Sequence, residues 1–212
     1  MTRKSLPLVL SALLLLPTLA LGGWAVITVE DLPDYVVAGQ PLTLTFMVRQ
    51  HGRTPLSGLS PRVEATSAGL EASAAAVAGD RTGRYQATLT LPQAGNWTIT
   101  IHSGFMNSKT TLLPMPAVAA GSPPALALPE PERGARLFVA KGCVTCHVQI
   151  AVGPDLSGKR FDPEFLRRFL ADPSILPASA GATFGMPNLS LKPAEITALL
   201  AYLNTERQAQ AR

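Results

Sequence analysis

The chain has two cysteines, Cys143 and Cys146, separated by two residues, and His147 follows the second directly. Two thiols and an imidazole at this spacing suit three kinds of chemistry: a redox-active disulfide, a zinc site, or covalent attachment of a c-type haem. In the third kind, each sulfur forms a thioether bond with a vinyl group of one porphyrin, and the histidine becomes the proximal ligand of the iron.

The residues around the motif favour the haem. A thiol oxidoreductase carries its Cys-x-x-Cys in a βαβ unit, which the flanking sequence does not predict. Structural zinc takes four nitrogen or sulfur ligands, and no cysteine or histidine follows His147. We therefore expect one covalent haem c attached at Cys143 and Cys146, with a disulfide or a metal ion as the remaining alternatives.

Haem iron takes a second axial ligand in an electron carrier, and Met186 is the one methionine after His147. It lies in the segment TFGMPNLS (183–190), just before the last expected helix. A histidine–methionine pair raises the reduction potential and leaves no open coordination position, so we expect an electron carrier and not an enzyme. The alternative is a methionine that fills a gap in the core.

Three helices are expected to position these residues, over 131–142, 162–173 and 192–208. Their apolar residues recur at the spacing of an amphipathic helix. The residues expected to face inward are Leu137, Phe138, Phe165, Leu166, Phe169, Leu170, Ile196, Leu199, Leu200 and Leu203. An all-α domain over 131–208 buries little surface and needs a staple or a cofactor.

Taken together, residues 130–206 resemble a small class I, monohaem cytochrome c. The matching segments are GARLFVAKGCVTCH, GPDLSG, FGMPNLS and EITALLAYL, in the order found in the family. The resemblance implies the all-α cytochrome c fold. It also implies thioether bonds at Cys143 and Cys146, with His147 and Met186 as the proximal and distal iron ligands.

The same resemblance assigns roles outside the motif. Pro154 matches the proline whose carbonyl accepts a hydrogen bond from the proximal imidazole, which orients the ring and increases its basicity. Gly134 and Phe138 match the contact of the first helix with the last, where Tyr202 supplies the opposing ring. An ordinary turn proline and a flexible helix start are the alternatives.

The first half of the chain predicts β-structure. Strands are expected at 24–29, 41–48, 84–91 and 96–101. The last three alternate apolar and polar residues, as strands with one buried face do. The turn sequence PQAG (92–95) predicts a hairpin between the last two strands. Short strands at regular spacing indicate an immunoglobulin-like β-sandwich over 23–113.

The segments VVAGQPLTLTFMV, GRYQATLTL and GNWTITI resemble the FixH/YtkA-like family of small exported β-sandwich domains. The resemblance implies a scaffold without universal catalytic residues. A proline-rich linker is expected over 114–130. The sandwich would then dock on a redox partner, or space the haem domain from it.

The first 22 residues predict export. Arg3 and Lys4 precede an apolar run that ends in small residues, as in a signal peptide. Because residues 5–29 contain no charge, an uncleaved membrane anchor is the alternative. In both cases we expect a periplasmic or other extracytoplasmic location.

The formal net charge is +4, without a basic run interleaved with aromatic residues, so we expect no nucleic-acid partner. The expected partners are periplasmic or membrane redox complexes. Lys141, Lys159 and Arg160 lie close in sequence to the haem-binding segments. They are predicted to steer an acidic partner to the haem edge, with a merely solvated face as the alternative.

Three other functions stay open. A structural haem-bearing subunit of a membrane respiratory or photosynthetic complex fits the same motifs, as does an enzyme with an open haem site. A copper-handling module is the third, because thioether and imidazole groups bind Cu(I). Its candidate ligands are His51, His102, Met106 and Met115.

Overall fold

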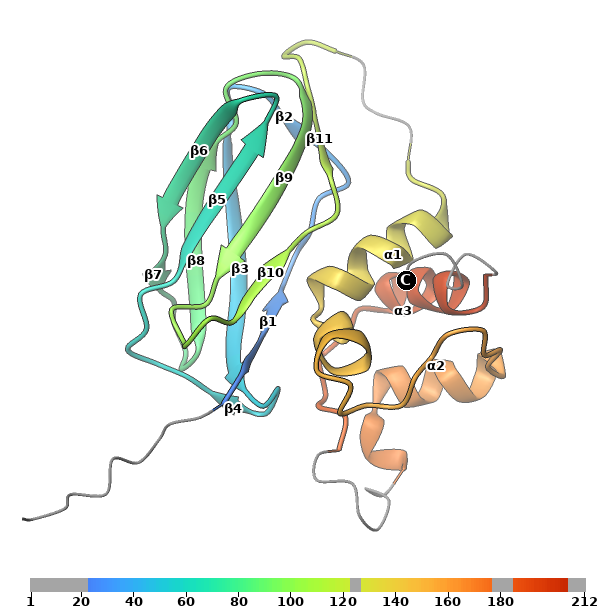
Figure 1. Ribbon diagram of the computed structural model, residues 1–212. Coiled ribbons are helices and arrows are strands. Elements are labelled where there is room, and N and C mark those ends of the chain that lie inside the picture. The colour runs from blue at the N-terminus through green and yellow to red at the C-terminus, as the bar shows by residue number, and fades with distance from the viewer. Residues whose placement is uncertain (1–22, 123–126, 177–184, 206–212) are drawn as a thin grey trace, which may run out of the picture.

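The computed structural model describes residues 23–122, 127–176 and 185–205. The predicted signal peptide or anchor at 1–22 lies outside this range, as do residues 206–208 of the last predicted helix. The sheets come first in the chain, and the helices lie along one side of them (Figure 1). In the described part of the chain, no helix has the length and apolar content needed to cross a membrane.

Two sheets form the first half. One has the order β1-β3-β8-β7 with β4 beside β3, and the other has the order β2-β11-β9-β5-β6 with β10 beside β9. The strands are β1 (Ala25–Val29), β2 (Val36–Val37), β3 (Pro41–Gln50), β4 (Thr54–Pro55), β5 (Arg62–Ser67), β6 (Leu70–Ala75), β7 (Val77–Ala78), β8 (Arg84–Thr90), β9 (Gly95–His102), β10 (Lys109–Thr111) and β11 (Met115–Val118). Phe46, Tyr85 and Trp97 are the largest side chains of their shared core. The β-sheet prediction is confirmed.

The predicted hairpin between β8 and β9 is wrong. β8 pairs with β3 and β7, whereas β9 pairs with strands of the other sheet. The chain after β8 crosses between the sheets: Leu91 is buried in the core, and its carbonyl oxygen accepts the amide of Gly39 at 2.8 Å. A turn sequence specifies a change of direction, but packing decides which sheet the next strand joins.

The predicted linker over 114–130 is also wrong in its first part. Met115–Val118 form β11, which is antiparallel to β9 and parallel to β2. Met115 and Ala117 alternate into the sandwich core. The proline content obscured this strand, although a short strand accepts a proline where its missing N–H is not needed. At the other end, α1 begins at Glu130, within one residue of the predicted end of the linker.

The second half is helical. It contains α1 (Glu130–Ala140), the π-helical turn η1 (Thr145–Gln149), α2 (Pro163–Ala171), the 3-10 turn η2 (Pro173–Ile175) and α3 (Pro193–Leu203). Eight of the residues expected to face inward are buried in one core: Leu137, Phe138, Leu166, Leu170, Ile196, Leu199, Leu200 and Leu203. Side-chain caps start two helices, with Asp162 Oδ1 accepting the amide of Phe165 at 2.7 Å and Glu195 accepting that of Lys192 at 2.9 Å.

Candidate haem-binding site

The crossing of α1 and α3 forms the base of the site. Gly134 lies against α3, since a Cβ atom there would be 2.0 Å from the carbonyl oxygen of Ala198 and 2.6 Å from Cβ of Tyr202. The rings of Phe138 and Tyr202 contact each other, with centroids 5.5 Å apart. The structure therefore contains the helix contact that the resemblance assigned to these residues.

The segment with the two cysteines follows directly from α1. Lys141 caps the helix, and Gly142 takes a φ of +79°, a left-handed conformation that favours glycine. The next turn is η1, which carries Cys146 and His147. Cys143 comes just before it and packs, partly buried, against the helical core. Short π-helical turns of this kind are often found at functional sites.

The loop after η1 holds the imidazole of His147. Its Nδ1 lies 2.9 Å from the carbonyl oxygen of Pro154. Because a carbonyl oxygen can only accept, Nδ1 carries the proton and Nε2 carries the lone pair that a metal ligand needs. Gly153 packs against the ring: a Cβ atom there would be 2.8 Å from Nδ1 and from Cε1. This loop thus sets both the tautomer and the orientation of the ring.

Burial determines the chemistry of the two thiols. It raises the pKa of Cys143 to about 12 and also raises the pKa of Cys146. A redox-active cysteine needs the opposite shift, because the thiolate is the reactive form. Among the described residues, no group of three or more His, Cys, Asp or Glu side chains is placed to hold a metal ion. Neither alternative reading of the motif is supported.

Met186 lies in the segment that leads into α3. It is partly buried and packs against the same helical core as Cys143. Locally, Ser190 has a φ of +53° and donates its amide to Oδ1 of Asn188 at 2.8 Å. Residues 183–184 of the predicted ligand segment lie outside the described residues. In the structure, the side chains of Met186 and Cys143 therefore pack against the same hydrophobic core.

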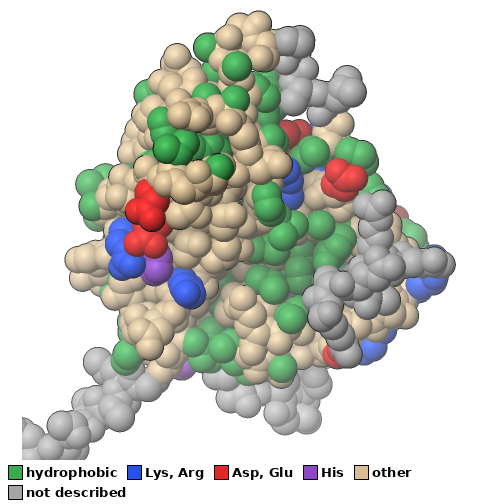
Figure 2. All heavy atoms as spheres, turned by 45° about the horizontal axis from the view of Figure 1, so that its top comes forward, with side chains coloured by type: hydrophobic (Ala, Val, Ile, Leu, Met, Phe, Trp, Pro, Cys, Tyr) green, Lys and Arg blue, Asp and Glu red, His purple; other side chains and the backbone are tan. Residues whose placement is uncertain are grey.

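The residues present fit a covalently bound haem. The donor set combines two neutral thiols, an imidazole whose Nε2 is available, and a thioether. A porphyrin also needs apolar walls, and partly buried apolar side chains contact the same core: Val144, Leu156, Phe161, Phe169 and Leu191. On the face shown in Figure 2, hydrophobic side chains gather beside the sandwich, with the charged side chains around them.

Comparison with known families identifies this half of the chain. Residues 131–206 match the model of the cytochrome c family. These residues form a cytochrome c domain. The family implies covalently bound haem, and the two cysteines of the cytochrome c domain agree with a single attachment motif.

Comparisons with curated proteins and with solved structures do not identify a further relative of the chain. No curated protein matches the chain. The structure of surface layer protein SbsC, domains 1–6, is 26% identical with a TM-score of 0.33, and the match covers 45% of this chain and 13% of that chain. SbsC domains 4 and 5 are 23% identical with a TM-score of 0.30, and the match covers 44% and 50% of the respective chains. TM-scores this low do not establish a shared fold.

Lys141, one of the three cations predicted at the haem edge, is buried and cannot contact a partner there. Lys141 is 3% exposed, and its Nζ lies 2.7 Å from Oε1 of Glu195. Lys159 and Arg160 are exposed, as that prediction requires. Sequence reasoning missed this buried ion pair, for which there was no local signal. It also missed Gly153, although a glycine beside Pro154 was a signal that a close approach to the backbone occurs there.

The copper alternative loses its support. Met115 is fully buried in the sandwich core, while Met106 is exposed. His102 Nε2 lies 2.8 Å from Oε2 of Glu64, which engages its imidazole. The ring of His51 packs edge-on against Trp24. The described side chains therefore do not present a joint set of imidazole and thioether ligands.

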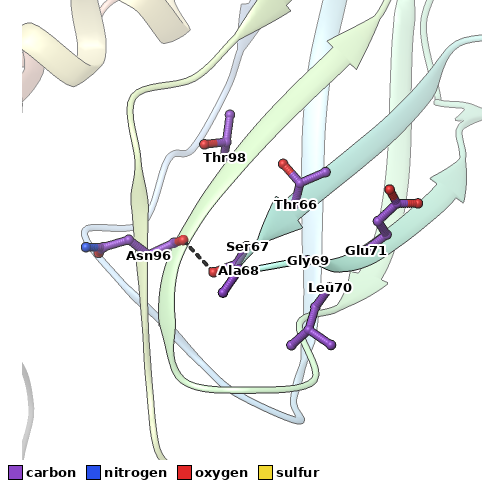
Figure 3. Close-up of a pocket in the computed structure, with 8 residues that line it drawn as sticks. All are labelled: Thr66, Ser67, Ala68, Gly69, Leu70, Glu71, Asn96 and Thr98. Carbon is purple, nitrogen blue, oxygen red and sulfur yellow. Dashed lines mark hydrogen bonds between the residues drawn. The ribbon is translucent and has the colours of Figure 1, made fainter.

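The sandwich also has an open polar pocket at the β5–β6 turn (Figure 3). Ser67 donates a hydrogen bond to the carbonyl oxygen of Asn96 at 2.7 Å across this pocket. Glu71 is the one charged side chain that lines it. The remaining residues that line the pocket are uncharged.

Proposed function

We propose that the protein is a periplasmic electron carrier with one covalent haem c. Cys143 and Cys146 would attach the haem through thioether bonds, and His147 and Met186 would ligate its iron. The observation that carries the proposal is the 2.9 Å contact between His147 Nδ1 and the carbonyl oxygen of Pro154, because it directs the lone pair of a neutral imidazole to Nε2.

When bound, the haem supplies the reversible one-electron couple of its iron. Two groups of the protein would adjust that couple: the backbone carbonyl of Pro154 orients the imidazole, and the thioether of Met186 favours the reduced metal. The core between α1 and α3, around Phe138 and Leu199, keeps water out of the interior. Because His147 and Met186 would both ligate the iron, oxygen and peroxide would find no free coordination position, so we infer a carrier and not an enzyme.

The proposed partners are periplasmic or membrane redox complexes that exchange electrons at the haem edge. Exposed Lys159 and Arg160 favour a partner with an acidic surface. The sandwich is proposed as a docking module of the FixH/YtkA-like, immunoglobulin-like type. Residues 1–22 are proposed to direct export or to anchor the chain.

A structural haem-bearing subunit of a membrane respiratory or photosynthetic complex is the second candidate. It is favoured by the direct contact between the two domains, which includes the buried side chain of Lys141. A haem that relays electrons within a complex needs a fixed position relative to the rest of its subunit. A haem domain that carries electrons on a flexible linker does not. Co-purification with a membrane complex, through an uncleaved N-terminus, would favour this candidate.

The test begins with the purified native protein. We expect an intact mass that includes one haem per chain and a pigment that acid–acetone extraction does not remove. Extraction that leaves a colourless polypeptide would contradict the proposal. Carbon monoxide binding to the reduced protein at neutral pH would reveal an open axial position and favour an enzyme instead.

Met186→Leu tests the distal ligand. The substitution removes the sulfur and keeps the size of the side chain, so it should abolish the sulfur-to-iron absorption band and lower the reduction potential. The matched control is Met106→Leu, at an exposed methionine of the sandwich, which should change neither. An unaltered band in Met186→Leu would remove this residue from the ligand set.

A further inference from the structure

The edge strand β1 of the sandwich is buried on both of its faces. Ala25, Ile27 and Val29 belong to the sandwich core. Val26 and Thr28 point away from that core, yet each is 4% exposed. The outer face of a sandwich sheet normally meets solvent or a covering element. Here the end of α1 in the cytochrome c domain covers the second face, since α1 contacts β1.

The closest approach is made by the residue before the first cysteine. A Cβ atom on Gly142 would lie 2.3 Å from Cγ1 of Val26 and 2.9 Å from the carbonyl oxygen of Ile27. Only a glycine permits this contact of the backbone with β1. The haem-attachment segment, defined here as residues 142–149, therefore begins on the surface of the sandwich.

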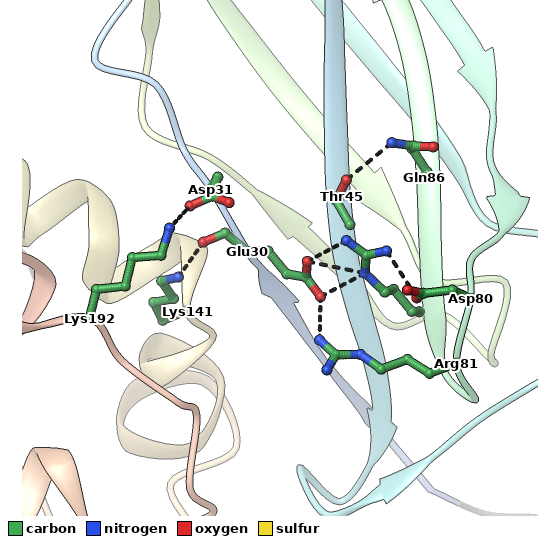
Figure 4. Close-up of polar contacts among 9 residues, drawn as sticks. Glu30, Asp31, Thr45, Asp80, Arg81, Gln86, Lys141 and Lys192 are labelled. Carbon is green, nitrogen blue, oxygen red and sulfur yellow. Dashed lines mark hydrogen bonds and ion pairs between the residues drawn. The ribbon is translucent and has the colours of Figure 1, made fainter.

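Lys141, directly before Gly142, contacts both domains. Its Nζ donates to the backbone oxygen of Glu30 at 2.6 Å and lies 2.7 Å from Oε1 of Glu195 on α3. The Thr28 hydroxyl lies 3.5 Å from the backbone oxygen of Lys141. Figure 4 shows Lys141 reaching Glu30, with Lys192 next to it reaching Asp31. The ammonium group of Lys141 thus has partners on β1's end and on the last helix.

The sandwich also reaches the segment of the other proposed ligand. A Cβ atom on Gly52, in the turn after β3, would lie 3.7 Å from Cγ of Pro187 and 3.4 Å from Cγ2 of Val26. Pro187 directly follows Met186. Farther out, Arg133 of α1 forms an ion pair with Asp34 at 2.8 Å. The contacts of the sandwich therefore include the neighbours of both proposed ligand segments.

We propose that the outer face of β1 holds the haem-attachment segment in position, with Val26 and Lys141 as the positioning residues. The sandwich is then part of the structure that sets the ligand geometry, in addition to any docking role. A partner that shifts β1 would alter the haem environment through Gly142. This inference rests on the proposed haem site for its effect on ligation, but the mechanical coupling concerns the chain alone.

Two valine truncations in the full-length purified protein test the coupling. Val26→Ala opens space beneath Gly142, whereas Val63→Ala opens equivalent space in the sandwich core, away from the outer face of β1. We expect Val26→Ala to speed amide hydrogen exchange over 142–149 by about tenfold, with Val63→Ala leaving that segment unchanged. In the haem-loaded protein, Val26→Ala should also shift the reduction potential, and Val63→Ala should not.

Equal exchange over 142–149 in the two variants, or no change in Val26→Ala, would overturn the inference. These outcomes are separate from failure of the proposed function. If the wild-type protein carries no haem, the proposed function fails, and the exchange comparison on that same protein still decides whether β1 holds the segment.

Discussion

The carbonyl oxygen of Pro154 lies 2.9 Å from Nδ1 of His147, and Gly153 packs against the same ring. Gly153 makes this possible, because any side chain there would meet the imidazole. The turn that holds the proximal ligand thus depends on a residue that contributes no side chain.

Gly153→Ala tests this arrangement. The new methyl group would lie 2.8 Å from Nδ1 and Cε1, so the ring must move away from the Pro154 carbonyl. We expect a lower haem content per chain and a weakened sulfur-to-iron band, both measured spectroscopically. Val152→Ala, at an exposed residue of the same loop, should retain full haem content. Wild-type haem content and spectrum in Gly153→Ala would show that the ring is not confined there.

Gly134→Ala should separate α1 from α3. In an open helix position this change stabilises a protein by up to about 1 kcal/mol. Here the added Cβ would lie 2.0 Å from the carbonyl oxygen of Ala198, so we expect a loss of about 1–3 kcal/mol in the free energy of unfolding. Denaturant titration measures it, with Glu132→Ala on the exposed side of α1 as the control. A stabilised Gly134→Ala protein would contradict the close crossing.

Lys141→Met should destabilise the protein strongly. The substitution keeps the apolar part of the side chain but removes the ammonium group. The buried carboxylate of Glu195 is then left without its cation. Breaking such a pair costs about 3–5 kcal/mol. The double variant Lys141→Met/Glu195→Gln should recover part of this loss in the same titration. Lys109→Met, at an exposed lysine of β10, should have little effect, and a similarly small effect at Lys141 would refute the buried pair.

Acid should weaken the network around Glu30. Its side chain accepts hydrogen bonds from Arg84 and Arg81, and the bond from Arg84 is the main cause that lowers the pKa of Glu30 below its ordinary value of 4.5. Because the folded pKa is the lower one, this stabilisation is present above about pH 4.5 and is lost as the pH falls through the folded pKa.

Glu30→Gln should therefore lower the melting temperature at neutral pH and make it depend less on pH below about 4.5. Calorimetry over a pH series measures both effects. Glu71→Gln, at an exposed residue of β6, provides the control. If Glu30→Gln and the wild type lost stability in parallel as the pH fell, the ion pairs of Glu30 would not be the source of the acid sensitivity.

The sequence was informative where the physical cause is local. Helix periodicity predicted the buried faces of α2 and α3, and the Cys-x-x-Cys-His spacing predicted a haem site because two sulfurs and a ring must reach one porphyrin. The fold expectation for 131–208 agrees with the cytochrome c domain at 131–206. The ligand roles of Met186 and of Cys143, Cys146 and His147 stay predictions that the pigment tests will decide.

The tertiary structure decided what depends on distant parts of the chain. The segment after β8 has the sequence of a hairpin turn, but the next strand, β9, belongs to the opposite sheet. The sequence predicted Lys141 as a surface cation, because its partners are far away in the chain. They are the carboxylate of Glu195 and the backbone oxygen of Glu30. Burial of a charge is a property of the assembled partners, and only the packing of α1 against both α3 and β1 brought those partners together.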